Sequence, residues 1–187
     1  DDRIAHTLGK SFVNFDGVTL HPPGTIRTQS GTPYSVFTQY ARAFHQRVVV
    51  PPCLPSPRSM PPVPKEIAES SIDIPTIESL GLRHNQQLIR GGERAAHQRL
   101  QLFLDTSLKT YSDDRNQLGM PGTSRLSADL KFGTLSIRQV WSAVSTQRSS
   151  IESVRAFQNE LVWREFALHT LFDRPELLEK PFRPEFD

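Results

Sequence analysis

A short turn rich in glycine and hydroxyl side chains is the first part of this sequence that could do chemistry. It reads Gly122-Thr123-Ser124-Arg125-Leu126-Ser127, and a helix-forming stretch follows it. Backbone amides at the start of a helix have no partner within the helix, and the helix dipole favours negative charge there. Together with the hydroxyl groups, these amides predict a site for a phosphate or pyrophosphate. The alternative is plain helix capping, which is the commoner role of such residues.

A second candidate lies on a longer helical pattern near the end of the chain and reads Asn159-Glu160-Leu161-Val162-Trp163-Arg164-Glu165-Phe166. Phe157, Glu160, Leu161 and Arg164 recur at helical spacing and share one stripe, and Trp163 is adjacent to Glu160. A Glu160–Arg164 pair on an ordinary surface would be worth only about 0.3–0.5 kcal/mol. Because aromatic residues flank these charges, we interpret them as lining a cavity.

Other reactive residues give weaker signals. Tyr111 and Arg115 are four apart, so they share a helix face, although an arginine packed on a tyrosine would look the same. The six histidines show no metal-ligand spacing, and no metal site is predicted. The single cysteine, Cys53, excludes an internal disulfide and lies among prolines, which is typical of a linker.

The elements that must position these residues are mainly helical. After residue 90, apolar residues recur every three or four positions, and they include Ala96, Leu100, Phe103, Leu104, Leu108, Val140, Val144, Val154, Phe157, Leu161 and Leu168. Ser136 is predicted to cap one helix and Ser149 or Ser150 the next. Gly133 and Pro175 are predicted helix stops.

The first half of the chain is less regular. Residues 11–15 alternate between apolar and polar side chains, which predicts a short strand, and a helical pattern ends near Phe44. Residues 47–88 are rich in proline and predict an extended linker, with a ligand for an SH3-type domain as the alternative. The net charge of +2 is too small to indicate nucleic-acid binding by itself, and no membrane-spanning run or signal peptide is visible.

Three motifs, in order and at this separation, resemble the DNA photolyase/cryptochrome family. They are the turn at residues 122–127, the segment 159–166 and an upstream Gly91-Gly92-Glu93-Arg94-Ala95-Ala96. Residues 28–38 and 181–186 resemble further family segments, while Phe157 stands where many members have tryptophan. The resemblance implies a mainly α fold, the start of the helical FAD-binding domain. It also implies that residues 1–46 are the tail of an α/β antenna domain, 47–88 an interdomain linker and 89–187 the truncated flavin domain.

The resemblance also implies roles for individual residues. Those assigned to the flavin are Tyr111, Thr123, Ser124, Arg125, Leu126, Ser127 and Arg164. Glu160 and Trp163 are assigned to catalysis and to the damaged DNA, where Trp163 would stack on the lesion and Glu160 would hydrogen-bond it. The cofactor is FAD, and the longer protein could carry an antenna chromophore of the folate or deazaflavin type.

The implied function is light-dependent repair of pyrimidine dimers by electron transfer from reduced FAD, the activity of a deoxyribodipyrimidine photo-lyase. We expect a monomeric, cytoplasmic protein of the bacterial type whose partner is damaged DNA and not a membrane. Two alternatives stay open. One is a cryptochrome-type photoreceptor without repair activity, and the other is an inactive truncated fragment, since both ends of the chain fall inside family domains.

Overall fold

The computed structural model describes residues 2–13, 17–83, 85–183 and 185. The chain divides into two compact units, one made of Asp1–Cys53 with Gly92–Asp187 and the other of Leu54–Gly91. Within the described residues all regular structure is helical and no strand is present, which confirms the predicted mainly α class. None of the helices in this part of the chain is long and apolar enough to cross a membrane.

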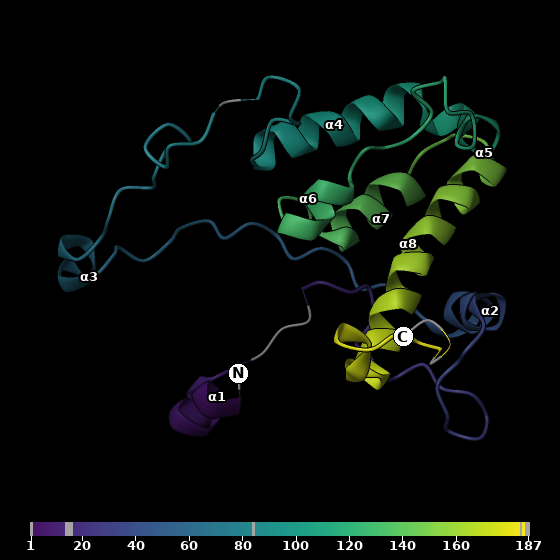
Figure 1. Ribbon diagram of the computed structural model, residues 1–187, viewed down its shortest axis with the longest axis horizontal. Coiled ribbons are helices and arrows are strands. Elements are labelled where there is room, and N and C mark those ends of the chain that lie inside the picture. Colours follow the sequence, from purple (N-terminus) through teal and green to yellow (C-terminus); the bar gives the residue numbers. More distant parts are fainter. Residues whose placement is uncertain (1, 14–16, 84, 184, 186–187) are drawn as a thin grey trace. The chain divides into compact units, whose positions relative to one another are not determined.

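The first unit is organised around α8, a helix of 23 residues from Ile151 to Asp173 (Figure 1). Its N-cap is Ser150, whose hydroxyl accepts a hydrogen bond from the Ser153 amide, and it ends just before Pro175, as predicted. Among the described residues five elements pack against it: α2 (Phe37–Arg47), η2 (Leu108–Thr110), α5 (Tyr111–Asp114), α7 (Ile137–Ser145) and η3 (Pro175–Leu178). Residues that are far apart in the sequence therefore meet on this one helix.

The predicted apolar stripes account for about half of the buried hydrophobic core. The stripe of α4 (Glu93–Thr106) is buried, and it continues into the buried Leu108 of η2. On α7 the predicted N-cap Ser136 is confirmed, and Gln139 completes a capping box by accepting from the Ser136 amide. Two short helices, α6 (Ser127–Phe132) and η3, contain no fully buried apolar residue; the one buried residue of α6 is Asp129.

The short helix α6 is fixed to α4 by a charged pair. The carboxylate of Asp129 is buried, and the Arg99 guanidinium donates to both of its oxygens at 2.6 and 3.0 Å. This hydrogen-bonded arginine holds the pKa of Asp129 below its usual value, and the Thr134 hydroxyl also donates to it. At the other end of α6 the predicted stop is confirmed, since Gly133 adopts the left-handed conformation (φ 69°).

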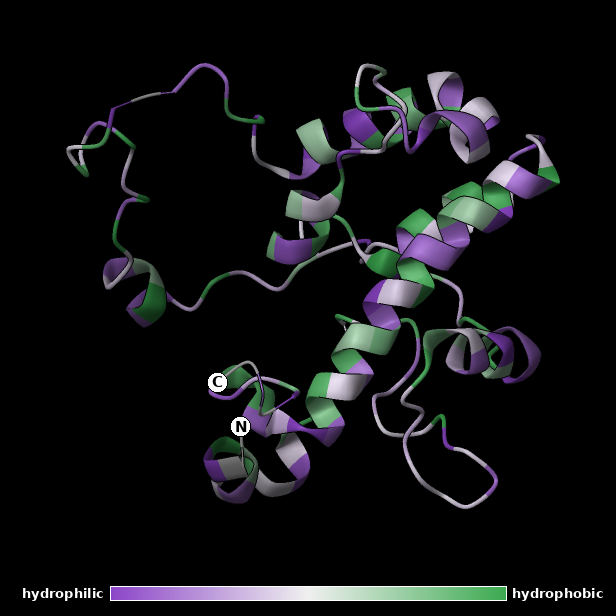
Figure 2. Ribbon diagram, turned by 45° about the vertical axis from the view of Figure 1, so that its right-hand side comes forward, coloured by the Kyte–Doolittle hydropathy of each residue, from purple (hydrophilic) through white to green (hydrophobic). Residues whose placement is uncertain are grey.

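Helix α8 is buried along two stripes, where the sequence predicted one. Phe157 and Leu161 lie in the predicted stripe, and Val162, Glu165 and His169 form a second one at i, i+3 and i+7. In Figure 2 the ribbon of α8 accordingly alternates between hydrophilic and hydrophobic colours along its length. A helix covered on two sides can bury polar residues that a one-sided pattern would place in water.

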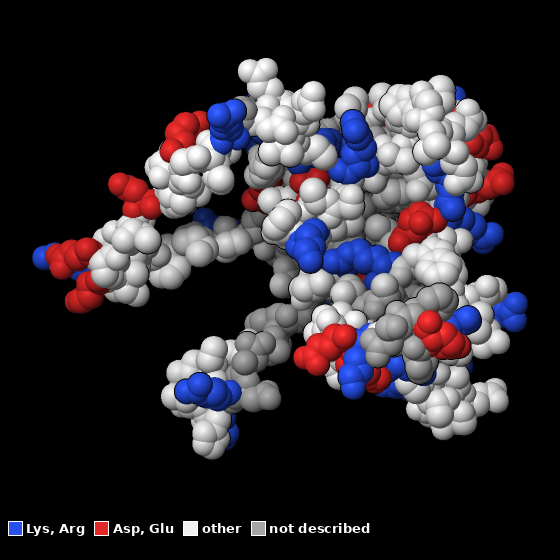
Figure 3. Space-filling model, in the orientation of Figure 1, with Lys and Arg blue, Asp and Glu red and all other residues white. Residues whose placement is uncertain are grey.

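Two other expectations need correction. The predicted strand at residues 11–15 is wrong for its described part, because Ser11 closes a 3₁₀ turn (η1, Gly9–Ser11) after α1 (Asp2–Leu8); Asn14 and Phe15 lie outside the described residues. The proline-rich region also contains a short helix, α3 (Lys65–Glu69), that was not predicted. Every described residue of Leu54–Gly91 is exposed. On the molecular face in Figure 3, basic and acidic side chains are interspersed, in keeping with the small net charge.

Candidate functional site

A cavity of about 600 Å³ brings most of the predicted site residues together. Its walls come from α5, the turn before α6, α6 itself and α8. The lining residues are Tyr111, Thr123, Ser124, Arg125, Leu126, Ser127, Leu130, Lys131, Phe157, Glu160, Leu161, Arg164 and Leu168. The eight predicted residues among them lie in three separate parts of the sequence, so the fold, and not sequence proximity, assembles them.

The turn before α6 has two unusual backbone features. A side chain at Gly122 would place its Cβ 2.8 Å from the carbonyl oxygen of Asp114, so only glycine allows this close approach. Arg125 has a φ of 53°, a left-handed conformation that costs a non-glycine residue free energy. Glycine is therefore needed at position 122 for close packing.

The hydroxyl groups of this turn do not cap α6. The N-cap position is Leu126, and no side chain makes a capping hydrogen bond there; Ser124 Oγ accepts only a long bond, 3.4 Å, from the Leu126 amide. Thr123 and Ser127 are exposed, and their hydroxyls have no hydrogen-bond partner in the described part of the chain. The geometry therefore does not favour the capping alternative, and it leaves donors facing the cavity.

The charged residues of α8 pair with other elements and not with each other. Glu160 Oε1 accepts from Arg115 Nη1 at 2.7 Å, and the Arg115 guanidinium lies 5.8 Å from the centre of the Tyr111 ring. Burial raises the pKa of Tyr111; the Glu160 carboxylate adds to this rise, and Arg115 opposes it. Arg164 instead donates to the backbone carbonyls of Val18 at 2.6 Å and Leu130 at 3.5 Å. The cavity interpretation of these charges thus fits better than a surface Glu160–Arg164 pair.

Trp163 is the one predicted site residue that does not line this cavity. The residue is 46% exposed, and its indole stacks on Phe37 of α2, with ring centroids 3.5 Å apart and planes 9° from parallel. Phe166 meets both rings edge-on at 6.0 Å. Trp163 therefore lies on a flank of α8 and shares its surroundings with α2.

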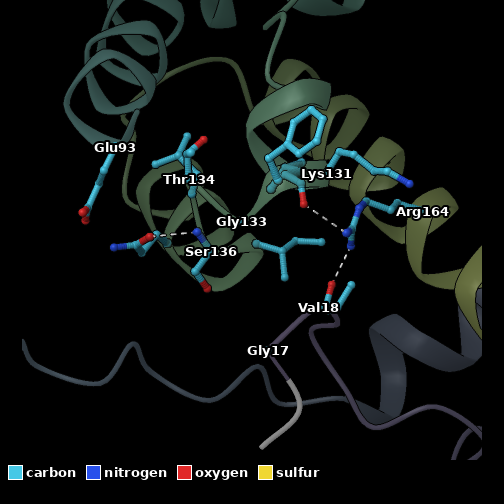
Figure 4. A pocket seen from close by; sticks show the side chains of 13 residues that line it. Gly17, Val18, Glu93, Lys131, Gly133, Thr134, Ser136 and Arg164 are labelled. Carbon is cyan, nitrogen blue, oxygen red and sulfur yellow. Dashed lines mark hydrogen bonds between the residues drawn. The ribbon is translucent and has the colours of Figure 1, made fainter. Parts of the chain in front are cut away.

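A second cavity, of about 660 Å³, lies beside the loop between α6 and α7. Figure 4 shows its lining, which includes Glu93, Thr134 and Ser136, with Arg164 linking the end of α6 to Val18. The two cavities share Leu130, Lys131 and Arg164. The second contains no other predicted site residue, so we take the first as the candidate functional site.

A buried polar cluster was missed by the sequence analysis. Glu165 is fully buried, and its Oε2 accepts from the backbone amides of Leu20 at 2.9 Å and His21 at 3.4 Å. Burial raises its pKa to about 7, although the two amides and the nearby Arg164 and Arg138 oppose the rise. In the sequence, the one signal is that Glu165 lies three residues after the apolar Val162. This pattern is too common to predict a buried carboxylate.

Tyr40 and His169 complete this cluster. Burial and the Glu165 carboxylate raise the pKa of Tyr40, and burial lowers the pKa of His169. The Tyr40 hydroxyl and Glu165 Oε1 are buried without a hydrogen-bond partner among the residues that the structure describes. All three side chains are buried, and Glu165 and His169 hydrogen-bond the backbone of residues 20 and 21. We therefore interpret the cluster as structural and not as an accessible site.

Comparison with known proteins identifies the class. Residues 1–62 match the family model described as DNA photolyase, and the resemblance inferred from the sequence is confirmed. Among curated relatives, a deoxyribodipyrimidine photo-lyase from Synechococcus sp. (strain ATCC 27144) is 33% identical over 95% of this chain and 39% of its own length. The corresponding enzyme from Agrobacterium fabrum is 34% identical over 96% of this chain and 38% of its own length.

Two further matches extend this result. An uncharacterized 31.6 kDa protein from Synechococcus sp. (strain PCC 6716) is 39% identical over 79% of this chain and 54% of its own length. The crystal structure of a class III photolyase from Agrobacterium tumefaciens superimposes with a TM-score of 0.75 at 29% identity, covering 100% of this chain and 40% of that one. The chain therefore spans between 38% and 54% of the length of these relatives.

Proposed function

We propose that this chain supplies the phosphate-holding turn and one cavity wall of a light-dependent enzyme that repairs pyrimidine dimers in DNA. The observation that supports this most is the single cavity in which Tyr111, the turn at residues 123–127 and Glu160 meet. The relatives named deoxyribodipyrimidine photo-lyase supply the class of reaction. We also propose the domain division at residues 1–46, 47–88 and 89–187 that the family resemblance implies.

The residues present fit FAD by the chemistry of their donors. Thr123 and Ser127 offer hydroxyls that have no partner within the described part of the chain, and Lys131 and Arg164 add positive charge on the same cavity. This set suits a pyrophosphate, because hydrogen bonds to charged oxygens are stronger than neutral ones. Tyr111 would flank the remainder of the cofactor. When bound and reduced, FAD supplies the light-excited electron, and the protein supplies orientation.

The flank of α8 would hold the lesion. A dimerised pair of pyrimidines stacks poorly, so rotating it out of the duplex costs less than rotating out normal bases. Arg115 holds one oxygen of Glu160, and the other has no partner among the described residues, so it can accept a hydrogen bond from the lesion. The exposed indole of Trp163 offers an aromatic surface on which an extruded base can stack.

The decisive experiment uses the longest protein whose reading frame contains these residues. Purified protein should carry FAD, and near-ultraviolet or blue light should restore an oligonucleotide that contains one cyclobutane thymine dimer. A dark sample and an undamaged oligonucleotide are the controls. Protein that binds flavin but neither prefers the dimer nor repairs it would be a photoreceptor, and protein without flavin would be an inactive remnant.

A substitution separates the lesion site from the flavin site. Trp163→Ala should leave the flavin content unchanged but weaken binding to dimer-containing DNA roughly tenfold, since stacking a base on an aromatic residue is worth about 1–3 kcal/mol. If affinity for damaged and undamaged DNA fell equally, Trp163 would only be a packing residue.

A further inference from the structure

The stacked pair of Phe37 and Trp163 connects α2 with the flank of α8. The two rings are nearly parallel, and their centroids are only 3.5 Å apart. Isolated aromatic rings prefer offset or edge-on arrangements to such a direct overlap. The surrounding structure must therefore hold the pair together, and Phe166, edge-on to both rings at 6.0 Å, is part of that support.

Helix α2 is anchored to the unit independently of this stack. Its Tyr40 and Phe44 are almost completely buried, and Tyr40 packs against the rings of Phe166 and His169 on α8. Near the other end of α2, His45 Nε2 hydrogen-bonds Asn159 Oδ1 of α8 at 2.9 Å. Because these contacts fix α2, Phe37 at its first turn is a rigid support and not a ring that follows the tryptophan.

The exposure of Trp163 shows what this support leaves available. Phe37 covers one face of the indole, yet 46% of the residue remains exposed, so a large part of the side chain is still available for contact. An unsupported tryptophan side chain can rotate about two bonds, and ordering it on binding would cost entropy. A ring backed by Phe37 has already lost much of that freedom before a base arrives.

We infer that Phe37 is a positioning residue that holds Trp163 with one face open for an extruded, unstacked base. The inference rests on the proposed function in that the base is taken to be part of a DNA lesion. It assigns part of the lesion site to α2, which the family resemblance places in the tail of the antenna domain. That helix therefore helps to shape the wall that meets the DNA.

Three substitutions in the longest protein that contains the chain test this inference. Phe37→Leu keeps an apolar side chain but removes the flat ring, and Phe37→Tyr restores a ring. Phe44→Leu is the matched control, because it removes another ring from α2 that contacts Tyr40 and Trp141 but is not in contact with Trp163. The first readout is the ratio of the dissociation constants for undamaged and dimer-containing duplexes. The second is the fluorine NMR signal of Trp163 in protein labelled with 5-fluorotryptophan.

Phe37→Leu should lower the ratio about three- to tenfold, as expected for partial loss of base stacking. It should also shift the Trp163 signal, while Phe37→Tyr should retain the parent values and Phe44→Leu should lower only the melting temperature. An unchanged ratio in Phe37→Leu, or an equal fall in Phe44→Leu, would overturn the inference. If the parent protein itself shows no preference for the dimer, the proposed function fails. In that case the Trp163 signal tests the positioning role of Phe37 by itself. A shift in Phe37→Leu but not in Phe44→Leu would support that role, and an unchanged signal in Phe37→Leu would contradict it.

Discussion

Two carboxylates of α8 lie only five residues apart and have opposite surroundings. The Glu160 side chain is 39% exposed, borders the cavity and is paired with Arg115. Glu165 is completely buried and accepts from the backbone amides of Leu20 and His21, without a salt-bridge partner among the described residues. At about 100° per residue the two side chains leave the helix on different sides, so one meets the cavity and the other the N-terminal segment.

The difference shows that a perturbed pKa does not by itself mark the reactive group. Of the two carboxylates, Glu165 has the pKa raised to about 7, a value suited to an acid–base catalyst. Yet the hydrogen bonds of Glu165 among the described residues come only from backbone amides inside the unit, whereas Glu160 faces the cavity in which the other predicted residues gather. Exposure and neighbours therefore assign Glu165 to the fold and Glu160 to the candidate site.

The largest effect is expected from removing the buried carboxylate. Glu165→Ala should destabilise the protein by about 3–5 kcal/mol, because it leaves a void and deprives two buried amides of their acceptor. Urea unfolding followed by circular dichroism measures this loss. Glu160→Ala is the matched control and should change the free energy of unfolding by less than about 1 kcal/mol, since its ion pair is partly exposed. Similar losses for the two variants would remove the contrast between the two sites.

The raised pKa of Glu165 predicts a pH dependence of opposite sign to that of a salt-bridged acid. The folded state holds the proton up to about pH 7, while the unfolded chain releases it near pH 4.5. The contribution of Glu165 to stability is therefore greatest below pH 4.5 and falls as the pH rises to 7, by about 3 kcal/mol in total.

Glu165→Gln isolates this contribution, since the amide does not titrate. Between pH 4.5 and 8, the free energy of unfolding of the variant should rise by about 3 kcal/mol relative to that of the parent. The comparison is needed because His169, whose pKa is lowered, changes stability in the opposite direction as the pH falls below about 6.5. A difference between parent and variant that stayed constant with pH would mean that the pKa of Glu165 is not raised in the folded state.

The hydroxyl groups of the turn should affect the cofactor and not the fold. Replacing Thr123 and Ser127 together by valine keeps the shape of the threonine and adds only one methyl group at the serine. It would delete two proposed hydrogen bonds to charged oxygens, so the FAD dissociation constant should rise roughly a hundredfold or more. Flavin fluorescence titration measures this, with the far-ultraviolet helix signal as the control. Loss of helix in protein that still held its flavin would show that the hydroxyls are structural.

Local features of the sequence were enough to predict much of this structure. The caps at Ser136 and Ser150 and the stops at Gly133 and Pro175 depend on neighbouring residues, and all are confirmed. The aromatic neighbours of Glu160 predicted that it lines a cavity, and it does so together with residues 123–127 of the predicted phosphate turn. Their roles in binding stay predictions until the substitutions above are measured.

The contacts that could not be predicted join distant parts of the chain. Glu165 accepts from amides 144 and 145 residues away, and Phe37 stacks on Trp163 from a different helix. Glu160 pairs with Arg115, although the sequence placed Arg164 at the favoured i+4 spacing. Helical periodicity identifies a face of a helix but does not say which distant segment covers it, and α8 is covered on two sides.

The smallest effect on stability, with a clear effect on binding, is expected from Glu160→Gln. The amide keeps the size of the side chain and can still accept from Arg115, so the free energy of unfolding should change by less than about 1 kcal/mol. It loses the charge that would strengthen a hydrogen bond to the lesion, so affinity for dimer-containing DNA should fall about tenfold, since hydrogen bonds to charged groups contribute about 1.5–3 kcal/mol. Fluorescence anisotropy with damaged and undamaged duplexes measures this, and only the damaged duplex should respond. Glu165→Gln should alter the free energy of unfolding but leave the ratio of the affinities for damaged and undamaged duplexes unchanged. The two Glu→Gln variants therefore test whether Glu160 belongs to the binding site and Glu165 to the fold. If Glu165→Gln changed the ratio and Glu160→Gln did not, the assignment of the two carboxylates would be reversed.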